Sequence, residues 1–402
     1  MRGERGAGRT GHPEGAERPK DLSADLASLR TQEFPWTADT IYLNNASIGP
    51  LPERTRLVLE AFNRKRAAPF QLPDRELFAT LAESRRLAAE LIGAMPEEIG
   101  LTINTGFGLS LAARALPLKA GDIALTSDRE FPANVYPWMM LRENGVKLEL
   151  VPTTPEGWPD EARLVERLSD PRVRVLAISL VQFSNGYTVN LGRLSAATRA
   201  SGTYLVVDAI QGVGQIPVDL SKTPVDVLSC GAQKWLLSPW GAGFVYVRRE
   251  LIRELRPSVT GWMAFEGTDD FTRLTQYDDT LRGDARRFEL ITLPYQEFAA
   301  MNASLGLLLG LGISGIAGHL RALHVPVLKW AERSGVRVMS PTDTARGSGI
   351  LCLAPPDVGA AFGALKAAHV VCGMREGAIR LSPHFYNTVD EMERVVDILE
   401  KS

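Results

Sequence analysis

Three short runs of apolar, largely β-branched residues stand out in the middle of the chain: VRVLAISLV at 173–181, TYLVVD at 203–208 and GFVYV at 243–247. Segments with helix-like spacing of apolar residues, such as 191–200, lie between them. Near-continuous apolar strands that alternate with amphipathic helices are typical of a parallel sheet covered by helices on both faces. The pattern therefore predicts an α/β domain built on a mostly parallel sheet.

The pattern changes towards both ends of the chain. Beyond about residue 314, a helix, short strands and a final helix at 388–401 predict a smaller α+β domain. The first 22 residues carry almost no large apolar side chains and cannot offset the entropy cost of ordering. We therefore divide the chain into a disordered tail at 1–22, an N-terminal arm at 23–50, a large ligand-binding domain at 51–285 and a small C-terminal domain at 286–402.

Residues 310–315, GLGISG, match the G-x-G-x-x-G pattern of dinucleotide-binding folds. They follow a helical run at 297–309 instead of a strand, so the context that gives the motif its meaning is missing. We interpret them as a glycine-rich helix end. A nicotinamide-dependent dehydrogenase would need this motif in an N-terminal strand–turn–helix, where the sequence lacks it.

Charge and cysteine content narrow the class of protein. A net charge of −2 over 402 residues provides no basic surface for nucleic acid or an acidic membrane. No stretch approaches the roughly 20 apolar residues of a membrane span. Cys230, Cys352 and Cys372 show no CxxC spacing and no histidine at metal-ligand spacing, so we expect reduced thiols and no metal site. A soluble, cytoplasmic protein with a small-molecule ligand is the expectation.

Asp208 and Lys234 provide the candidate chemistry. Asp208 ends an apolar strand, at the sheet edge where open α/β folds bind ligands. Lys234 follows a strand-like run at 226–230, and a partly desolvated lysine is a nucleophile for aldehydes. An aspartate at such an edge can keep a pyridine nitrogen protonated. Either residue alone is more simply interpreted as a turn cap or a surface lysine, but together they predict a pyridoxal 5′-phosphate (PLP) site with Lys234 and Asp208 as catalytic residues.

From about Thr40 to Leu399 the chain resembles the class V aminotransferase family of fold-type I PLP-dependent enzymes, which includes cysteine desulfurases, kynureninase and isopenicillin N epimerase. The motifs occur in the family's order: YLNNASIGPLP (42–52), NTGFGLSLAA (104–113), DREFPANVYPW (128–138), FSN (183–185), VDAIQ (207–211), GAQKW (231–235), RRFELITLP (286–294) and REGAIRLSPHFYNT (375–388). The resemblance implies the fold-type I architecture, with a large domain and a smaller α+β C-terminal domain, and PLP held as a Schiff base on Lys234.

The resemblance also implies roles around the cofactor. The glycine-containing turn at Thr105, Gly106 and Phe107 opens a helix and suits the cofactor phosphate. Phe131 corresponds to the residue that stacks on the pyridine ring, where desulfurases have histidine. Gln211 corresponds to the glutamine that binds the phenolic oxygen.

Three further positions follow from the same comparison. Asn185 corresponds to the family's asparagine near the phenolic oxygen and the substrate carboxylate. Gln233 stands where desulfurases have histidine, and a neutral amide cannot act there as an acid or base. Thr292 corresponds to the threonine that reaches the phosphate of the neighbouring subunit's cofactor, which implies a homodimer with shared active sites.

The substrate side is implied by the first and last motifs. Arg380 corresponds to the arginine that forms a bidentate pair with the substrate α-carboxylate, a task that suits a planar guanidinium. Ser47 lies in the segment that faces the substrate, and Arg375 and His384 are secondary candidates.

These motifs are shared by enzymes with different reactions. We expect a transaminase or a side-chain (β/γ) lyase that acts at Cα of a small amino acid, with an epimerase as the alternative. A cysteine desulfurase is less favoured, because residues 375–380 contain no cysteine and leave no room for a mobile loop. A PLP-binding regulator without catalysis is disfavoured by the retained Lys234 and by a tail too short for a helix-turn-helix.

Overall fold

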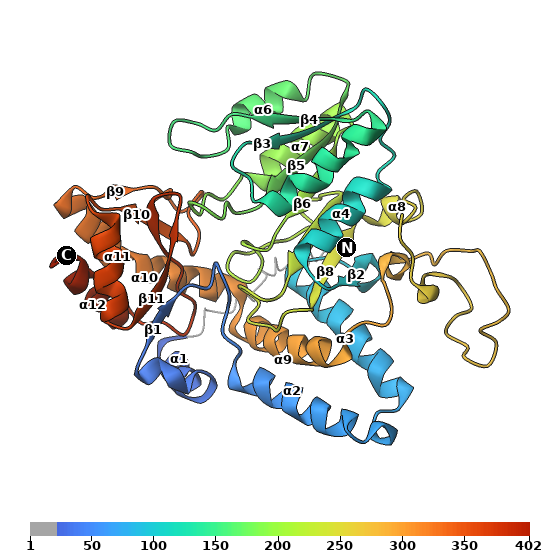
Figure 1. Cartoon of the computed structure of the whole chain (residues 1–402), viewed down its shortest axis with the longest axis horizontal. Coiled ribbons are helices and arrows are strands. Elements are labelled where there is room, and N and C mark those ends of the chain that lie inside the picture. The colour runs from blue at the N-terminus through green and yellow to red at the C-terminus, as the bar shows by residue number, and fades with distance from the viewer. Residues whose placement is uncertain (1–21) are drawn as a thin grey trace, which may run out of the picture.

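A computed structural model describes residues 22–402, so the predicted tail lies outside the described residues apart from Leu22 (Figure 1). The helices are α1 (Leu22–Glu33), α2 (Glu53–Arg66), α3 (Asp74–Ile92), α4 (Thr105–Ala115), α5 (Tyr136–Met139), α6 (Glu161–Arg167), α7 (Leu191–Ser201), α8 (Arg249–Ile252), α9 (Tyr295–Leu311), α10 (Ile313–Ser334), α11 (Val358–Ala367) and α12 (Val389–Leu399). The helix predicted at 191–200 is α7 and the one predicted at 388–401 is α12, so both are confirmed.

The large sheet has seven strands in the order β2-β8-β7-β6-β5-β3-β4. They are β2 (Ile99–Thr102), β3 (Ile123–Ser127), β4 (Lys147–Val151), β5 (Val173–Ser179), β6 (Tyr204–Asp208), β7 (Val227–Gly231) and β8 (Gly243–Val247). From β4 to β7 all neighbours are parallel, and β8 is antiparallel to both β7 and β2. The predicted mostly parallel α/β sheet is confirmed.

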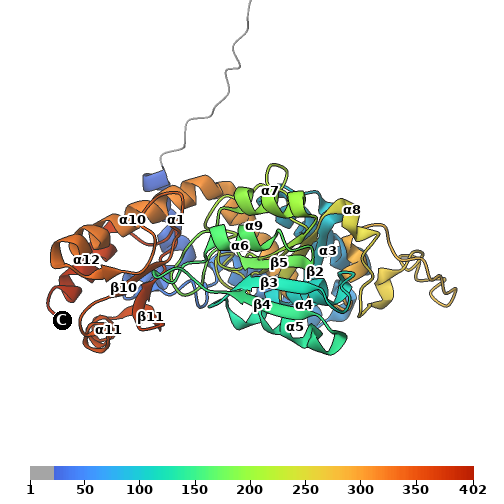
Figure 2. The same cartoon turned by 90° about the horizontal axis from the view of Figure 1, so that it is seen from above.

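Helices cover both faces of this sheet, with α6 and α7 on one side and α4 and α5 on the other (Figure 2). Alternate residues of β5 belong to different cores: Leu176 and Ile178 pack in the core on one face, Val175 and Ala177 in the core on the other. Because successive side chains of a strand point to opposite faces, a sheet buried on both sides needs apolar residues throughout. This burial explains the near-continuous apolar runs in the sequence.

The second sheet has five strands, in the order β1-β11-β12-β10-β9, and lies at the other end of the molecule (Figure 1). Its strands are β1 (Ile41–Leu43), β9 (Arg337–Val338), β10 (Leu351–Ala354), β11 (Val370–Arg375) and β12 (Ala378–Leu381). β1 comes from the N-terminal arm and pairs in parallel with β11, whereas the other pairs are antiparallel. The arm is thereby fixed to the C-terminal sheet.

Two long helices join the halves. α9 packs on α2 and α3, whereas α10 packs on α12, and Gly312 (φ +79°) lies between α9 and α10. The interpretation of GLGISG as a helix end is therefore confirmed. The domain division at residues 285/286 stays a prediction. Within residues 22–402 no single helix is long and apolar enough to cross a membrane, and α9 with α10 meets that test only as a pair bent by 76°.

Candidate active site

A cavity of about 440 Å³ lies where the ends of the large-sheet strands meet the N-terminal arm and the C-terminal sheet. This volume lies within the range of small-molecule pockets. Its lining residues come from segments far apart in the sequence: Ala46, Ser47, Asn104, Thr105, Gly106, Phe131, Ala133, Phe183, Asp208, Ile210, Gln211, Gln233, Lys234, Arg375 and Arg380. The cavity therefore brings together most of the residues predicted from the sequence.

Asp208 is the last residue of β6 and is buried. Among the described residues, one hydrogen bond to its carboxylate is found, from the Ile210 N–H to Oδ1 at 3.1 Å, which leaves Oδ2 for a ligand. Burial raises the pKa of Asp208 to about 7. A cationic partner would restore the ionised form, because an opposite charge favours ionisation.

Lys234 follows β7 in a tight turn, where its carbonyl accepts from the Leu237 N–H at 3.1 Å. The N-terminal arm packs on this turn so closely that a Cβ at Gly49 would lie 2.1 Å from the Lys234 carbonyl oxygen, so only glycine fits there. Desolvation lowers the pKa of Lys234 to about 8, opposed by the charge of Asp208. The amine is thus neutral in part near physiological pH and can act as a nucleophile.

Helix α4 begins beside the lysine turn. Asn104 caps it by accepting from the Phe107 N–H at 2.8 Å, and the Thr105 hydroxyl accepts from the Gly231 N–H at 2.8 Å. A Cβ at Gly106 would meet nothing nearer than 3.5 Å, so the space above the helix N-terminus is open. Helix N-termini bind phosphate through free N–H groups and the helix dipole.

Arg380 lies opposite, on β12, with 1% of its surface exposed. Its Nη1 donates to the Phe183 carbonyl at 2.7 Å and its Nη2 to the Ser47 hydroxyl at 2.7 Å, while Nε has no partner. Burial lowers the pKa of Arg380 to about 10, and the nearby charge of Arg375 adds to this effect. A buried guanidinium with unused N–H groups fits a carboxylate ligand.

Both polar atoms of the Gln211 side-chain amide form hydrogen bonds. Its Nε2 donates to the Ala46 carbonyl at 2.9 Å, and its Oε1 accepts from the Trp235 indole N–H at 2.8 Å. His384 Nδ1 accepts from the Phe385 N–H, which assigns the proton to Nε2, the donor to the Trp235 carbonyl. Burial lowers the pKa of His384 to about 4. His384 does not line the cavity, and it positions the tryptophan that follows Lys234.

Phe131 forms the apolar wall of the cavity. The Lys234 Nζ lies 5.6 Å from its ring centroid, and Phe183 packs edge-on against it with centroids 5.3 Å apart. Phe183 was not singled out in the sequence, because the resemblance directed attention to Asn185 in the same FSN motif.

Glu130, the residue before Phe131, was also missed. It is buried, accepts from the Ser179 N–H at 3.0 Å and from the Gln182 amide at 2.7 Å, and also binds the Ser179 hydroxyl. Ser179 pairs with Asp208 across β5 and β6. Glu130 therefore ties the turn that carries Phe131 to the strand beside the buried aspartate. A glutamate directly before a predicted wall residue was the available signal.

Besides His384, three predicted site residues do not line the cavity. Asn185 is buried, but its amide donates to the Gly157 carbonyl of a separate loop at 2.9 Å and accepts from the Tyr187 N–H of its own turn at 3.0 Å, so both of its polar atoms are used. Phe107 packs against the core on the α4 side of the sheet. Thr292 is exposed on the surface of its own chain.

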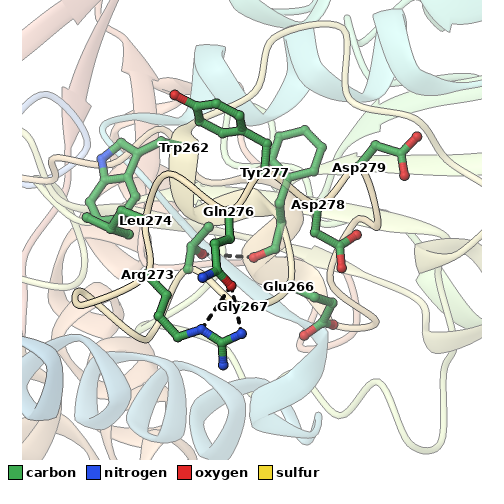
Figure 3. Close-up of a pocket in the computed structure, with 11 residues that line it drawn as sticks. Trp262, Glu266, Gly267, Arg273, Leu274, Gln276, Tyr277, Asp278 and Asp279 are labelled. Atoms are coloured by element: carbon green, nitrogen blue, oxygen red, sulfur yellow. Dashed lines mark hydrogen bonds between the residues drawn. The ribbon is translucent and has the colours of Figure 1, made fainter.

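The residues around the cavity fit PLP. The open N-terminus of α4 suits the phosphate, the free Oδ2 of Asp208 suits a ring N–H, and Lys234 suits the aldehyde. A larger cavity of about 1010 Å³ lies elsewhere, in the loop between Trp262 and Asp279 (Figure 3). That cavity is lined by Glu266, Asp278 and Asp279 but by no lysine, so it does not offer this chemistry.

Comparisons with known proteins identify the family of this chain. The model of the family described as "Aminotransferase class-V" matches residues 41–395. An uncharacterised aminotransferase of Bacillus subtilis (strain 168) is 29% identical over 78% of this chain and 81% of the relative. The isopenicillin N epimerase of Amycolatopsis lactamdurans is 28% identical over 89% and 94%.

Among solved structures, the apo cysteine desulfurase of Thermococcus onnurineus NA1 superposes with a TM-score of 0.83. It is 22% identical, and the match covers 93% of this chain and 97% of that one. This likeness confirms the expected fold-type I architecture, and the family match confirms the expected cofactor, PLP, and the expectation of an enzyme. With the family model matched over most of its length and the family's cofactor chemistry gathered in one cavity, the chain belongs to the class-V aminotransferase family.

Proposed function

We propose that this protein acts at Cα of a small amino acid, as a transaminase or a side-chain lyase, with PLP bound at Lys234. The observation that carries the proposal is the convergence of Lys234, Asp208 and Arg380 on one cavity. The lysine supplies an amine, the aspartate a counter-charge for a pyridine ring, and the arginine a binding group for a carboxylate. When bound, the cofactor supplies an electron sink for the carbanion at Cα.

The side chains of this protein divide the work. Arg380 and Ser47 hold the substrate carboxylate and so direct its amino group towards Lys234. Lys234, with its lowered pKa, takes up and returns a proton at its Nζ. Asp208 holds a proton at the ring nitrogen, and the wall formed by Phe131 excludes water from one side.

The lining residues favour proton transfer on one face of the substrate. Among the described lining residues, Lys234 and Asp208 have pKa values that suit proton transfer near neutral pH, about 8 and about 7, and Asp208 is assigned to the ring nitrogen, which leaves Lys234. Gln233, the residue before Lys234, has a neutral amide side chain and cannot transfer protons. An epimerase that used two bases would need a second group on the opposite face. Transamination and side-chain elimination need only one, and epimerisation remains the alternative because two relatives are named isopenicillin N epimerase.

The cysteines argue against a mobile-thiolate desulfurase. Cys230, Cys352 and Cys372 are all buried, and none lines the cavity. Burial raises the pKa of Cys352 and of Cys372 to about 12, so neither forms a thiolate near neutral pH.

The short connection between the strands that carry Arg375 and Arg380 also argues against a desulfurase. Only Glu376 and Gly377 join β11 to β12, which leaves no loop that could deliver a thiol to the substrate.

A panel of amino acids tests this proposal. Purified holoenzyme is incubated with each compound, the absorbance of the cofactor is followed, and keto acids, ammonia, pyruvate and enantiomers are measured. If the amino acid is converted to its keto acid only when a second keto acid is added as acceptor, the enzyme is a transaminase. If pyruvate and ammonia form without an acceptor, it is a lyase. Accumulation of the opposite enantiomer alone, or alanine with sulfide from cysteine that vanishes in Cys372→Ser, would contradict the proposal.

We further propose that the protein works as a homodimer whose active sites are shared. Two features support this: Thr292 is exposed on its own chain, and the loop between α8 and η7 (Ala285–Phe288) projects from the body in both views (Figures 1 and 2). This loop exposes Trp262, Phe271, Leu274 and Tyr277, an unusual concentration of apolar surface for a projecting segment. Location in the cytoplasm stays a prediction.

A further inference from the structure

The β11–β12 hairpin places two arginines on one face. The turn residues Glu376 and Gly377 both have positive φ (+47° and +75°), as two-residue hairpins of this kind require. The register pairs Arg375 with Ala378 and Gly373 with Arg380. Since directly opposed residues share a face and the side chains alternate along each strand, Arg375 and Arg380 are diagonal neighbours on the same side of the sheet.

The Arg380 guanidinium lies over Gly373 on the facing strand. A Cβ at Gly373 would lie 3.1 Å from Asn44 Oδ1, and 3.5 Å and 3.6 Å from Nε and Nη2 of Arg380, which is ordinary contact distance. From this position the Nη2 of Arg380 donates to the Ser47 hydroxyl at 2.7 Å. The Nη2 of Arg375 lies 3.4 Å from the same hydroxyl, so both guanidinium groups converge on one point.

No carboxylate within the described residues neutralises this pair of charges. Neither arginine forms an ion pair within 4.0 Å, and Asp208 is the one carboxylate among the residues lining the cavity. Two adjacent like charges without counter-ions destabilise a sheet. The arrangement becomes favourable when anionic groups of a ligand enter, and the phosphate of the cofactor is accounted for at α4.

We propose that the substrate is an amino acid whose side chain ends in a second anionic group, bound by Arg375 while Arg380 binds the α-carboxylate. This inference rests on the proposed function, since it assumes that Arg380 holds an amino acid. Arg380 is buried and fixed by two hydrogen bonds, which suits the group common to every amino acid. Arg375 is exposed at the cavity, and its Nη1 donates to the Met374 carbonyl at 2.8 Å, a surface contact that it can exchange for a substrate side chain of variable length.

Matched acidic and amide substrates test this assignment. Holoenzyme is titrated with L-aspartate, L-asparagine, L-glutamate and L-glutamine, and the apparent Kd is read from the cofactor absorbance. The better acidic ligand binds roughly tenfold more tightly than its amide, and the ratio falls as salt screens the exposed Arg375. Arg375→Gln brings the ratio close to one, and Arg375→Lys, which keeps the charge, retains a preference.

The control is Arg337→Gln, which removes an exposed arginine from β9 of the same sheet and keeps the wild-type ratio. A ratio near one in the wild type, with amino acids still changing the spectrum, overturns the acidic substrate and leaves the proposed function standing. A preference that survives in Arg375→Gln overturns the assignment to this residue. A spectrum that no amino acid perturbs overturns the proposed function itself.

Discussion

Lys234 combines burial with a reactive amine. Because burial lowers its pKa to about 8, the fraction of neutral amine rises as the pH passes upward through that value. We predict that capture of PLP by apoenzyme accelerates between pH 7 and 9 and levels off above that range. Stopped-flow absorbance at constant ionic strength measures the rate. A rate that climbs steadily towards pH 10.5, the ordinary value for lysine, would show that the cavity does not desolvate this amine.

Asp208 and Arg380 face the same cavity but act on different parts of the reaction. The charge of Asp208 counts most as the carbanion develops, so we predict that Asp208→Asn costs about 3 kcal/mol, on the order of 100-fold, mainly in kcat. Arg380→Lys loses the planar fork and raises KM instead. Steady-state kinetics of both variants decide the matter, and the opposite partition of kcat and KM would mean that the roles are wrongly assigned.

Predictability from sequence differs between neighbouring residues at this site. Asp208 and Lys234 were predictable, since each follows an apolar strand and a strand end fixes where its side chain lies. The surroundings of Asn185 were not, because its amide bonds to the Tyr187 N–H of its own turn and to the carbonyl of Gly157, a loop residue that only the fold brings close. The place of Glu130 directly before Phe131 marks it as a candidate, but the Ser179 and Gln182 donors that surround its carboxylate come from a distant segment that only the fold brings to it.

Helix α4 links the fold to cofactor binding. The Thr105 hydroxyl accepts from the Gly231 N–H, so Thr105→Val leaves a buried donor unpaired, at a cost of about 1–3 kcal/mol, and disturbs the phosphate end of the cavity. We predict both a lower melting temperature and weaker binding of PLP, measured by thermal denaturation and by fluorescence titration.

Thr198→Val in α7 provides the control for this loss. Thr198 is also buried and its hydroxyl binds helix carbonyls, but it lies outside the cavity. It should lower stability without changing the affinity for PLP. If both variants lost the same affinity for PLP, the N-terminus of α4 would not be the phosphate-binding site.

Among the secondary-structure elements, strands that are buried on both faces were the most predictable from the sequence. β6 and β8 coincide closely with the apolar runs at 203–208 and 243–247, because each run spans the full length of a buried strand. The parallel pairing of β1 with β11 was less accessible, because it joins segments more than 300 residues apart and β1 has only three residues. Pattern alone does not specify such long-range partners.

For the whole molecule, the projecting loop makes dimer formation testable. Tyr277 is 91% exposed, and Tyr277 and Leu274 both line the cavity of about 1010 Å³ in this loop, which is separate from the candidate active site (Figure 3). We predict that the wild type is a dimer and that the double variant Leu274→Asp with Tyr277→Asp has roughly half its mass, because buried charge disfavours an apolar interface. Light scattering coupled to size-exclusion chromatography measures the mass.

Phe70→Asp changes a comparably exposed aromatic residue in η2 (Pro69–Gln71) and should leave the mass unaltered. A wild-type protein that is monomeric at micromolar concentration would rule out the homodimer. A dimeric wild type together with a double variant of the same mass would show that the projecting loop does not form the interface.

Reduction of the holoenzyme with borohydride, followed by peptide mapping, tests most directly whether Lys234 carries the cofactor. The geometry of the cavity predicts one labelled peptide, the one that contains Lys234, and no label in Lys234→Ala, which still binds PLP without a covalent link. Lys222 and Lys329 do not line the cavity and provide internal controls. A label on either of them, or a label that persists in Lys234→Ala, would contradict the assignment of the active site.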